Sequence, residues 1–244
     1  MPDRSKRWHE AQRYERSYWE KRADQIKRGD TANLGWYEWR ANRLARWLTS
    51  LDVKTVSSAT NVLEIGNGPV GIISYFPGKR TIGLDPLEGF FKDNPELTEV
   101  RDPATHYLAG QGEYIPLRNG SCQLVIVDNC IDHVLRPERV VAEIRRVLHA
   151  EGVLYMSVNT RARIGYLVHR VMSRLAIDQG HPHSFTKGGF RSFINERGFE
   201  LLDYRHTTYL EASRDEIADN VLKGTAKSLL GIAEMATEIV ARLK

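Results

Sequence analysis

The segment NVLEIGNGPVG, residues 61–71, is the part of the sequence best suited to hold a nucleotide. Its apolar first half predicts a short strand, and three glycines, Gly66, Gly68 and Gly71, follow at once. Glycine tolerates positive φ and places no Cβ between the main chain and a ligand, so the strand end could touch a cofactor. Because glycine-rich strand ends also occur as plain tight turns, the glycines alone leave both interpretations open.

An acid after the second predicted strand favours the nucleotide interpretation. Residues 80–85 read as a strand that ends in Asp85, 21 residues after Glu64. Dinucleotide-binding folds place at about this separation an acid that accepts hydrogen bonds from a ribose. The alternative is that Asp85 caps a helix that begins at Pro86. The agreement between strand, glycines and acid favours the ribose role.

The segments that follow extend the pattern. They are GQGEYIPLRNGSCQLVIVDNCIDHV at 110–134, the helical run RPERVVAEIRRVL and the apolar run EGVLYMSVN. Together with the first two motifs, they resemble the class I S-adenosylmethionine-dependent methyltransferases, in particular the branch that acts on small molecules. The resemblance extends from about residue 60 to 206. It implies a Rossmann-like α/β fold with a doubly wound, mostly parallel sheet, and S-adenosylmethionine as cofactor.

The resemblance also assigns parts of the cofactor to individual residues. It implies that Gly66 and Gly68 lie against the methionine portion, and that Glu64 orients their loop. Asp85 would bind the ribose hydroxyls, and Gln111 stands where many relatives carry Asp against the adenine amino group. The complete set of expected cofactor-binding residues is Glu64, Gly66, Gly68, Asp85, Pro86, Gln111, Gly112, Glu113, Asp128 and Asn129.

Two features depart from the family pattern or leave a role open. The third glycine comes one residue later than in the usual ExGxGxG, with Pro69 and Val70 before it. Glu113 is equally open to being a surface residue at its turn.

The expected chemistry is methyl transfer by in-line displacement, which needs an acceptor atom about 3 Å from the methyl carbon but no covalent residue. A base assists a hydroxyl acceptor, and histidines at strand ends are the candidates. We expect His133 and His183 to be catalytic, although a structural role stays open for each. The residues expected near the acceptor are Tyr14, Trp19, Asn159 and His181.

No metal site is expected. Asp128 and Asn159 lack a second acid beside them, and His181 with His183 does not complete the oxygen-rich set that Mg²⁺ prefers. The run DNCI after the fourth strand also differs from the [DNS]PP[FY] of nucleic-acid amino-methyltransferases, and Cys130 lacks the neighbouring Pro of carbon-5 RNA enzymes. We therefore expect the acceptor atom to be an oxygen, or less readily a nitrogen, of a small molecule, sugar or natural-product intermediate.

Two alternatives remain. Residues 1–50 hold 12 Lys/Arg against 7 Asp/Glu and all five tryptophans, so they could bind RNA, although these aromatics could equally be the buried faces of two helices. A nicotinamide-dependent oxidoreductase shares the strand, the glycine loop and the acid.

The elements that position these residues alternate along the chain. We expect helices at 4–28 and 36–51, strands at 61–65, 80–85, 105–109, 123–128 and 152–158, and a clear helix at 137–148. This alternation predicts a parallel sheet that is covered on both faces.

Three parts of the chain are expected. Residues 1–59 would form a helical lid, 60–213 the catalytic core and 214–244 a C-terminal helix that could pair with a second copy as a homodimer. The seventh strand that is usual in the family has one candidate, 207–212. No apolar run is long enough for a membrane span and no signal core is present, so we expect a cytoplasmic protein without a membrane partner.

Overall fold

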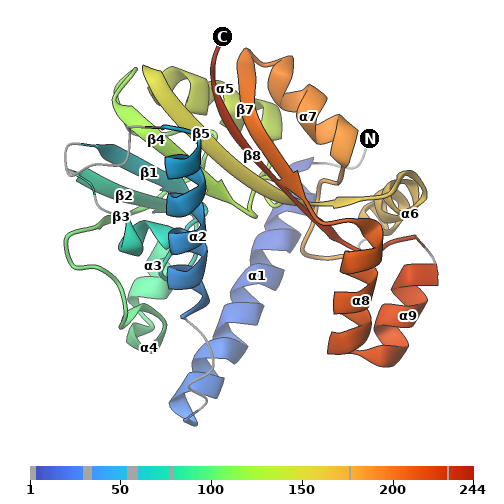
Figure 1. Ribbon diagram of the computed structural model, residues 1–244. Helices are drawn as coiled ribbons and strands as arrows, with labels where there is room; N and C mark the ends of the chain where they lie inside the picture. Colours follow the sequence, from blue (N-terminus) through green and yellow to red (C-terminus); the bar gives the residue numbers. More distant parts are fainter. Residues whose placement is uncertain are drawn as a thin grey trace.

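The strands expected from the sequence lie side by side in one sheet, as the computed structural model shows (Figure 1). The structure describes residues 4–29, 35–53, 60–76, 78, 80–175, 177–229 and 231–244. The strands are β1 (Asn61–Ile65), β2 (Arg80–Asp85), β3 (His106–Ala109), β4 (Cys122–Asp128), β5 (Leu148–Arg161), β6 (Phe185–Thr186), β7 (Phe199–His206) and β8 (Met235–Leu243).

The sheet has the order β3-β2-β1-β4-β5-β8-β7, and β6 pairs with the end of β5. Strands β1 to β5 run parallel to one another, whereas β8 is antiparallel to both β5 and β7. The expected α/β fold with a mostly parallel, Rossmann-like sheet is therefore confirmed. Because β1 and β4 are neighbours with β2 on one side and β5 on the other, the connections reverse direction between β1 and β4. Ligands of open α/β sheets bind at such a switch point.

Helices cover both faces of this sheet. The helices of the described residues are α1 (Arg4–Lys27), α2 (Trp36–Ser50), η1 (Ile72–Tyr75), α3 (Glu88–Lys92), α4 (Pro95–Thr98), α5 (Pro137–Val147), α6 (Arg163–Arg174), α7 (Lys187–Asn195), α8 (Tyr209–Asp219) and α9 (Val221–Leu229). On one face, Ile144 of α5 and Phe190 of α7 join the core of the sheet. On the other face, Leu44 and Leu48 of α2 pack with η1 and the opposite side of the strands.

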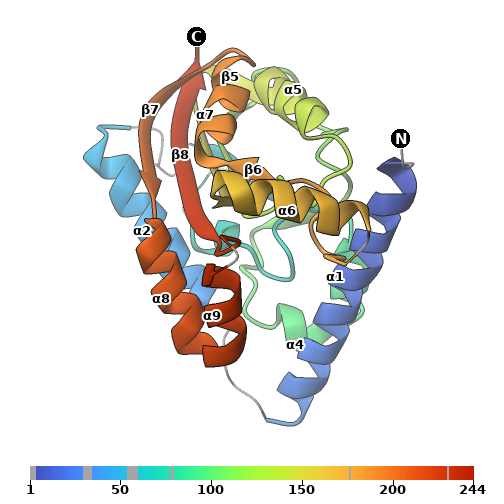
Figure 2. The ribbon, with the colours of Figure 1, turned by 90° about the vertical axis from the view of Figure 1, so that its right-hand side faces the viewer.

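The expected C-terminal helix at 214–244 is wrong. Residues 214–229 belong to the helical hairpin α8–α9, and residues 235–243 are the strand β8 between β5 and β7 (Figure 2). The apolar residues Met235, Ile239 and Leu243 are four positions apart, a spacing that fits both a helical turn and two repeats of a strand. The β-branched Thr237 and the burial of both faces favour the strand, because a central strand is covered on both sides.

The candidate for the seventh strand, 207–212, is also wrong. Thr208 caps α8 through a capping box in which its side chain accepts from the Glu211 N–H and the Glu211 side chain accepts from the Thr208 N–H. A capping box satisfies two free N–H groups at a helix start, so this stretch turns into a helix. The antiparallel strand of the family pattern is β8 instead, which makes residues 235–243 part of the core.

Three further expectations concern the domain boundary, membrane-spanning segments and a homodimer. The boundary expected at 59/60 falls at the end of residues 54–59, which lie outside the described residues. None of the described helices is long and apolar enough to cross a membrane. The homodimer stays a prediction, and the continuous C-terminal helix on which it rested is replaced by α8, α9 and β8.

Candidate active site

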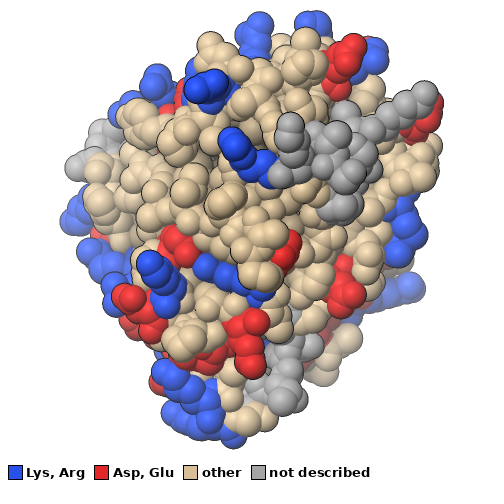
Figure 3. Space-filling view, turned by 90° about the vertical axis from the view of Figure 1, so that its left-hand side faces the viewer, with Lys and Arg blue, Asp and Glu red and all other residues tan. Residues whose placement is uncertain are grey.

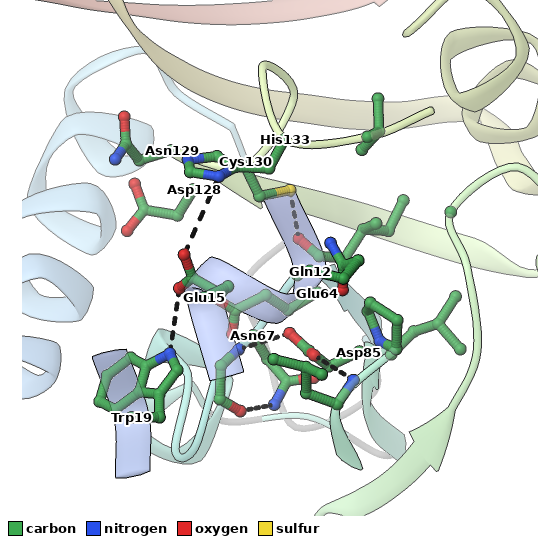
Figure 4. A pocket seen from close by; sticks show the side chains of 18 of the residues that line it. Gln12, Glu15, Trp19, Glu64, Asn67, Asp85, Asp128, Asn129, Cys130 and His133 are labelled. Atoms are coloured by element: carbon green, nitrogen blue, oxygen red, sulfur yellow. Dashed lines mark hydrogen bonds and ion pairs between the residues drawn. The ribbon is translucent and has the colours of Figure 1, made fainter. Parts of the chain in front are cut away.

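A cavity of about 400 Å³ lies at the carboxyl ends of β1, β2 and β4, and α1 forms its outer wall. Most of the expected site residues line it. They are Tyr14, Trp19, Glu64, Gly66, Gly68, Asp85, Pro86, Gln111, Gly112, Glu113, Asp128, Asn129, His133 and His181. Figure 4 shows how the polar side chains of β1, β2, β4 and α1 converge on this space. Its size is that of an ordinary small-molecule site.

The glycine loop after β1 is shaped by two close approaches. Gly66 and Gly68 have φ of +69° and +60°, and a Cβ on Gly66 would lie 2.5 Å from Cys130 Sγ. A Cβ on Gly68 would lie 3.1 Å from the Tyr37 hydroxyl. Any larger residue at these positions would be strained and would intrude on its neighbours, so the loop presents bare backbone to the cavity.

Glu64 holds the far end of this loop. Its carboxylate accepts hydrogen bonds from the N–H groups of Ile73 at 2.8 Å and Ile72 at 3.3 Å, the loop-orienting role expected from the sequence. The side chain is buried, and burial raises its pKa to about 8, although the two backbone hydrogen bonds oppose the shift. Glu64 can therefore exchange a proton near neutral pH if a cation enters the cavity.

Asp85 joins the end of β2 to the glycine loop. One carboxylate oxygen accepts from the Gly68 N–H at 2.9 Å, and the other accepts from the Leu87 N–H at 2.8 Å. The second bond has the form of the capping alternative, while the first ties the residue to the cavity. Burial raises the pKa of Asp85 to about 6. Each carboxylate oxygen keeps a second lone pair for a ligand hydroxyl.

The turn after β3 supplies the third side of the cavity. Gln111 is partly exposed there, and a Cβ on Gly112 would lie 2.8 Å from Ile65. Glu113 is no surface residue: it is 2% exposed, and its carboxylate accepts from the Arg136 N–H at 2.8 Å. Glu113 thus fixes the start of α5 while it lines the cavity.

The end of β4 carries a buried acid with a basic partner. Asp128 pairs with Arg40 of α2 at 2.6 Å and accepts from the Ser157 hydroxyl at the same distance. Asn129 follows with a φ of +53° and donates its N–H to the Ser157 hydroxyl at 2.8 Å. This turn sends the next residues, Cys130 to His133, back over the cavity.

Two imidazoles stand at the α6 side of the cavity. The rings of His133 and His181 have centroids 4.7 Å apart. His181 Nδ1 lies 3.0 Å from Asp178, which also accepts from His169 at 2.8 Å. Burial lowers the pKa of His181, but the hydrogen bond to Asp178 and nearby acids outweigh it and raise the pKa to about 8. Both histidines line the cavity.

Two expected residues lie elsewhere. His183 lines a neighbouring cavity, and its Nε2 bonds the Val134 carbonyl at 2.8 Å. Asn159 donates to Glu234 at 3.2 Å and is not among the residues that line the first cavity. The structure therefore brings His181, rather than His183, beside His133.

The contribution of α2 was not expected from the sequence. Tyr37 and Arg40 reach the cavity from the first turns of this helix, and Trp36 stacks on Tyr37 with a centroid distance of 3.8 Å. The role of Asn67 in the motif GNG was also not expected from the sequence. This residue is 2% exposed and lines the cavity between the two glycines. The cluster of tryptophans ahead of the core was the one signal that pointed to these helices.

Comparisons with known proteins agree with this geometry. Residues 63–156 match the family model described as a methyltransferase domain. A methyltransferase of Mycobacteroides abscessus without a characterised function is 32% identical over 99 residues, which cover 39% of this chain and 38% of that protein. An uncharacterised 37.1 kDa transposon protein of Streptomyces fradiae is 32% identical over 114 residues, 45% of this chain and 32% of that protein. The chain thus matches well under half the length of these relatives.

Solved structures share the fold at low sequence identity. Geranyl diphosphate C-methyltransferase of Streptomyces coelicolor, solved with Mg²⁺, geranyl diphosphate and S-adenosylhomocysteine, has a TM-score of 0.61 at 11% identity, over 88% of this chain and 86% of that chain. The [4+2]-cyclase SpnF has a TM-score of 0.56 at 14% identity, over 81% and 80%. The fold therefore hosts more than one chemistry. The chain therefore carries a methyltransferase domain with the fold of the class I S-adenosylmethionine-dependent methyltransferases, and the cofactor that this domain implies is S-adenosylmethionine.

Proposed function

We propose that the protein transfers a methyl group from S-adenosylmethionine to an oxygen atom of a small molecule. The observation that carries the proposal is a single cavity with a bare glycine loop and a buried acid on one side and two imidazoles on the other. An acceptor held at the imidazoles would share this enclosed space with the cofactor.

The residues of the cavity fit the cofactor. A Cβ at Gly66 would collide with Cys130, so the loop leaves room that a side chain would close. Asp85 retains acceptor capacity for ribose hydroxyls, and Gln111 can accept from an adenine amino group. Glu64 and Asp85 place two carboxylates beside a ligand that carries a sulfonium and an ammonium charge. Opposite charges in a buried site attract more strongly than in water, which supports this assignment.

When bound, S-adenosylmethionine supplies an electrophilic methyl group on sulfur. Transfer of this group to an acceptor oxygen would leave the electron pair of the S–C bond on sulfur, and the hydroxyl proton would have to pass to a base or to solvent. His133 and His181 are the side chains that can hold such a hydroxyl, because both line the cavity and imidazole nitrogens both donate and accept. Trp8, Tyr14 and Tyr18 of α1 would exclude water from the reacting atoms.

The nucleic-acid alternative has less support. Three of the five tryptophans, Trp8, Trp19 and Trp47, are buried, which agrees with the interpretation of helix faces. On the face at the β3 edge of the sheet, basic and acidic side chains are interspersed in the lower part, and a broad uncharged area lies above them (Figure 3). Nucleic-acid sites are marked by a continuous basic surface instead.

The test uses cofactor binding first and group transfer second. S-adenosylhomocysteine at 100 times its Kd should stabilise the native protein by about 2.7 kcal/mol, and NAD or NADP should not. Incubation with methyl-labelled S-adenosylmethionine and a panel of hydroxylated metabolites should then label an oxygen of one class. Stabilisation by a nicotinamide cofactor alone would refute the proposal, as would transfer only to RNA.

A further inference from the structure

Three residues at the α6 side of the cavity form a set of metal-ligand type. Asp132 and His133 follow β4, and His181 lies in the connection between α6 and β6. Each offers one ligand atom, and the three atoms all lie within 4.8 Å of one another. From the sequence, His181 was paired with His183 and no metal site was expected. The fold instead joins His181 to Asp132 and His133, which the sequence keeps far apart.

Asp132 is the strongest sign that something is bound here. Its side chain is 1% exposed, and its Oδ1 has no hydrogen-bond partner among the described residues. Leaving a buried carboxylate oxygen unpaired is costly, because the group gives up its hydration and receives nothing in return. His133 Nε2 lies 3.8 Å from this oxygen, too far for a hydrogen bond but close enough for both atoms to ligate one ion.

His181 is oriented as metal ligands usually are. Its Nδ1 lies 3.0 Å from Asp178, and a carboxylate on one ring nitrogen fixes the ring and leaves Nε2 for the metal. His133 Nδ1 faces Glu15 of α1 at 4.0 Å, beyond hydrogen-bond distance (Figure 4). Asp178 is itself held by the N–H groups of Gly180 at 3.1 Å and His181 at 3.0 Å.

A second set, His169, Asp178 and His181, also has ligand atoms within 4.8 Å of one another. There, however, Asp178 already accepts from both imidazoles, at 2.8 Å from His169 and 3.0 Å from His181. These hydrogen bonds satisfy the carboxylate without an ion. The second set therefore acts as the support of His181 rather than as a competing site.

We propose that Asp132, His133 and His181 bind a divalent transition-metal ion at the acceptor side of the cavity. Two imidazoles and one carboxylate suit Zn²⁺, Mn²⁺, Fe²⁺, Co²⁺ or Ni²⁺, whereas Mg²⁺ and Ca²⁺ prefer oxygen alone. Three protein ligands leave coordination positions open. This inference rests on the proposed function in one respect: the open positions would take the acceptor oxygen and, through the charge of the ion, lower the pKa of a bound hydroxyl.

The experiment measures metal binding without any methyl transfer. Protein free of a histidine tag is dialysed against a chelator, then titrated with Co²⁺ while its visible absorbance is recorded, with Zn²⁺ as competitor. We expect one Co²⁺ per chain, displaced by Zn²⁺. His133→Ala, His181→Ala and Asp132→Asn should each weaken binding by at least about 100-fold, because loss of a supporting residue alone costs about 10- to 100-fold.

The matched control is His106→Ala, which removes an exposed histidine at the start of β3 and should leave the affinity unchanged. His169→Ala separates the two sets, since it should cost no more than a supporting residue does. Circular dichroism melts show which variants are folded, and unfolded ones are replaced by His133→Gln or His181→Gln.

Two outcomes would overturn the metal site. One is the absence of Co²⁺ binding by wild-type protein, and the other is binding that survives His133→Ala but is lost in His169→Ala. S-adenosylhomocysteine binding is measured on the same samples. If the protein binds cofactor but no metal, this inference is refuted and the proposed function stands. If it binds metal but no cofactor, the metal site stands and the proposed function is refuted.

Discussion

The carboxylate of Asp85 accepts a hydrogen bond from the N–H of Gly68, 2.9 Å away, and so connects the end of β2 to the glycine loop of β1. One residue thereby shapes the loop and faces the ligand. The sequence offered a cap or a ribose acceptor as exclusive alternatives for Asp85. The structure combines a cap-like bond to Leu87 with a bond to the cofactor loop, because the two oxygens of one carboxylate serve different partners.

Asp85→Ala should weaken S-adenosylhomocysteine binding by about 10- to 150-fold, because hydrogen bonds to a charged group contribute about 1.5 to 3 kcal/mol. The released Gly68 N–H adds to the loss, while the fold should persist. Isothermal titration calorimetry measures the change. Asp93→Ala, at an exposed position after α3, is the matched control and should bind normally. Unchanged affinity in Asp85→Ala would mean that this acid serves only the turn.

Cofactor binding should release a proton from Glu64. Burial raises the pKa of this group from 4.5 to about 8 in the free protein, and the positive charges of the cofactor should lower it again. Affinity should therefore rise with pH up to about 8. Calorimetry of cofactor binding is carried out at pH 6.5, where the α-amino group of the cofactor is still protonated. The difference in binding enthalpy between two buffers of different ionisation enthalpy measures the released proton.

The stability of the free protein depends on the protonation of Glu64 in the opposite direction, since it falls with rising pH whereas cofactor affinity increases. A raised carboxyl pKa means that the folded state holds the proton more tightly than the unfolded state does. The contribution of Glu64 to stability is then fully present below pH 4.5 and is lost as the pH rises through about 8. Glu64→Gln should remove the share of Glu64 in both pH effects and leave that of Asp85, whose pKa is about 6. Identical binding enthalpies in the two buffers for the wild-type protein would contradict the prediction.

The C-terminal strand supplies a prediction on stability. Ile239 of β8 is 0% exposed, so Ile239→Ala should lower the free energy of unfolding by about 2 to 5 kcal/mol. Leu222→Ala in α9 is the matched control, since Leu222 is 86% exposed and its truncation should change stability by less than about 0.5 kcal/mol. Urea denaturation followed by circular dichroism compares them. Equal midpoints would argue against a central place for β8 in the sheet.

The parts of the fold that the sequence predicted are those with local signals. The strands β1, β2, β4 and β5 are apolar on both faces, and glycines or acids mark the ends of β1 and β2. β8 was missed because residues four apart share a face in a helix and in a strand alike, so only its place between β5 and β7 decides.

In the candidate site, too, residues with local sequence signals were predictable, whereas contacts made by tertiary packing were not. Glu64 and Asp85 were predictable because they lie in the last residues of two strands whose ends meet at one edge of the sheet. The pairing of His133 with His181, and of Arg40 with Asp128, depends on where α6 and α2 are placed by tertiary packing. No spacing in the sequence encodes such contacts, and His183 was chosen over His181 for this reason.

Helix α1 is fixed to the core at both of its ends, with the cavity beneath its middle. Near its start, Arg7 donates to the carbonyl groups of Ser173 at 3.2 Å and Gln179 at 2.8 Å, and also to that of Asp178. Near its end, Trp19 packs against Phe91 and Lys27 pairs with Glu96 at 2.9 Å. These contacts must break before α1 can open. We therefore expect opening of α1 to control access to the cavity, as lids do in other enzymes.

We predict that S-adenosylhomocysteine slows tryptic cleavage within α1, at Arg13, Arg16, Lys21 and Arg22. If α1 must open before it is cut, and opening excludes the ligand, then 100 times Kd of ligand should slow cleavage by up to about 100-fold. Mass spectrometry of the early fragments gives the rate at each site. Lys223 in the remote helix α9 is the internal control for general stabilisation, and Arg7→Ala should speed cleavage within α1 alone. Equal protection at Lys223 and in α1 would show that α1 does not open separately from the rest of the protein. Equal cleavage rates with and without the ligand would mean that α1 does not cover the cofactor.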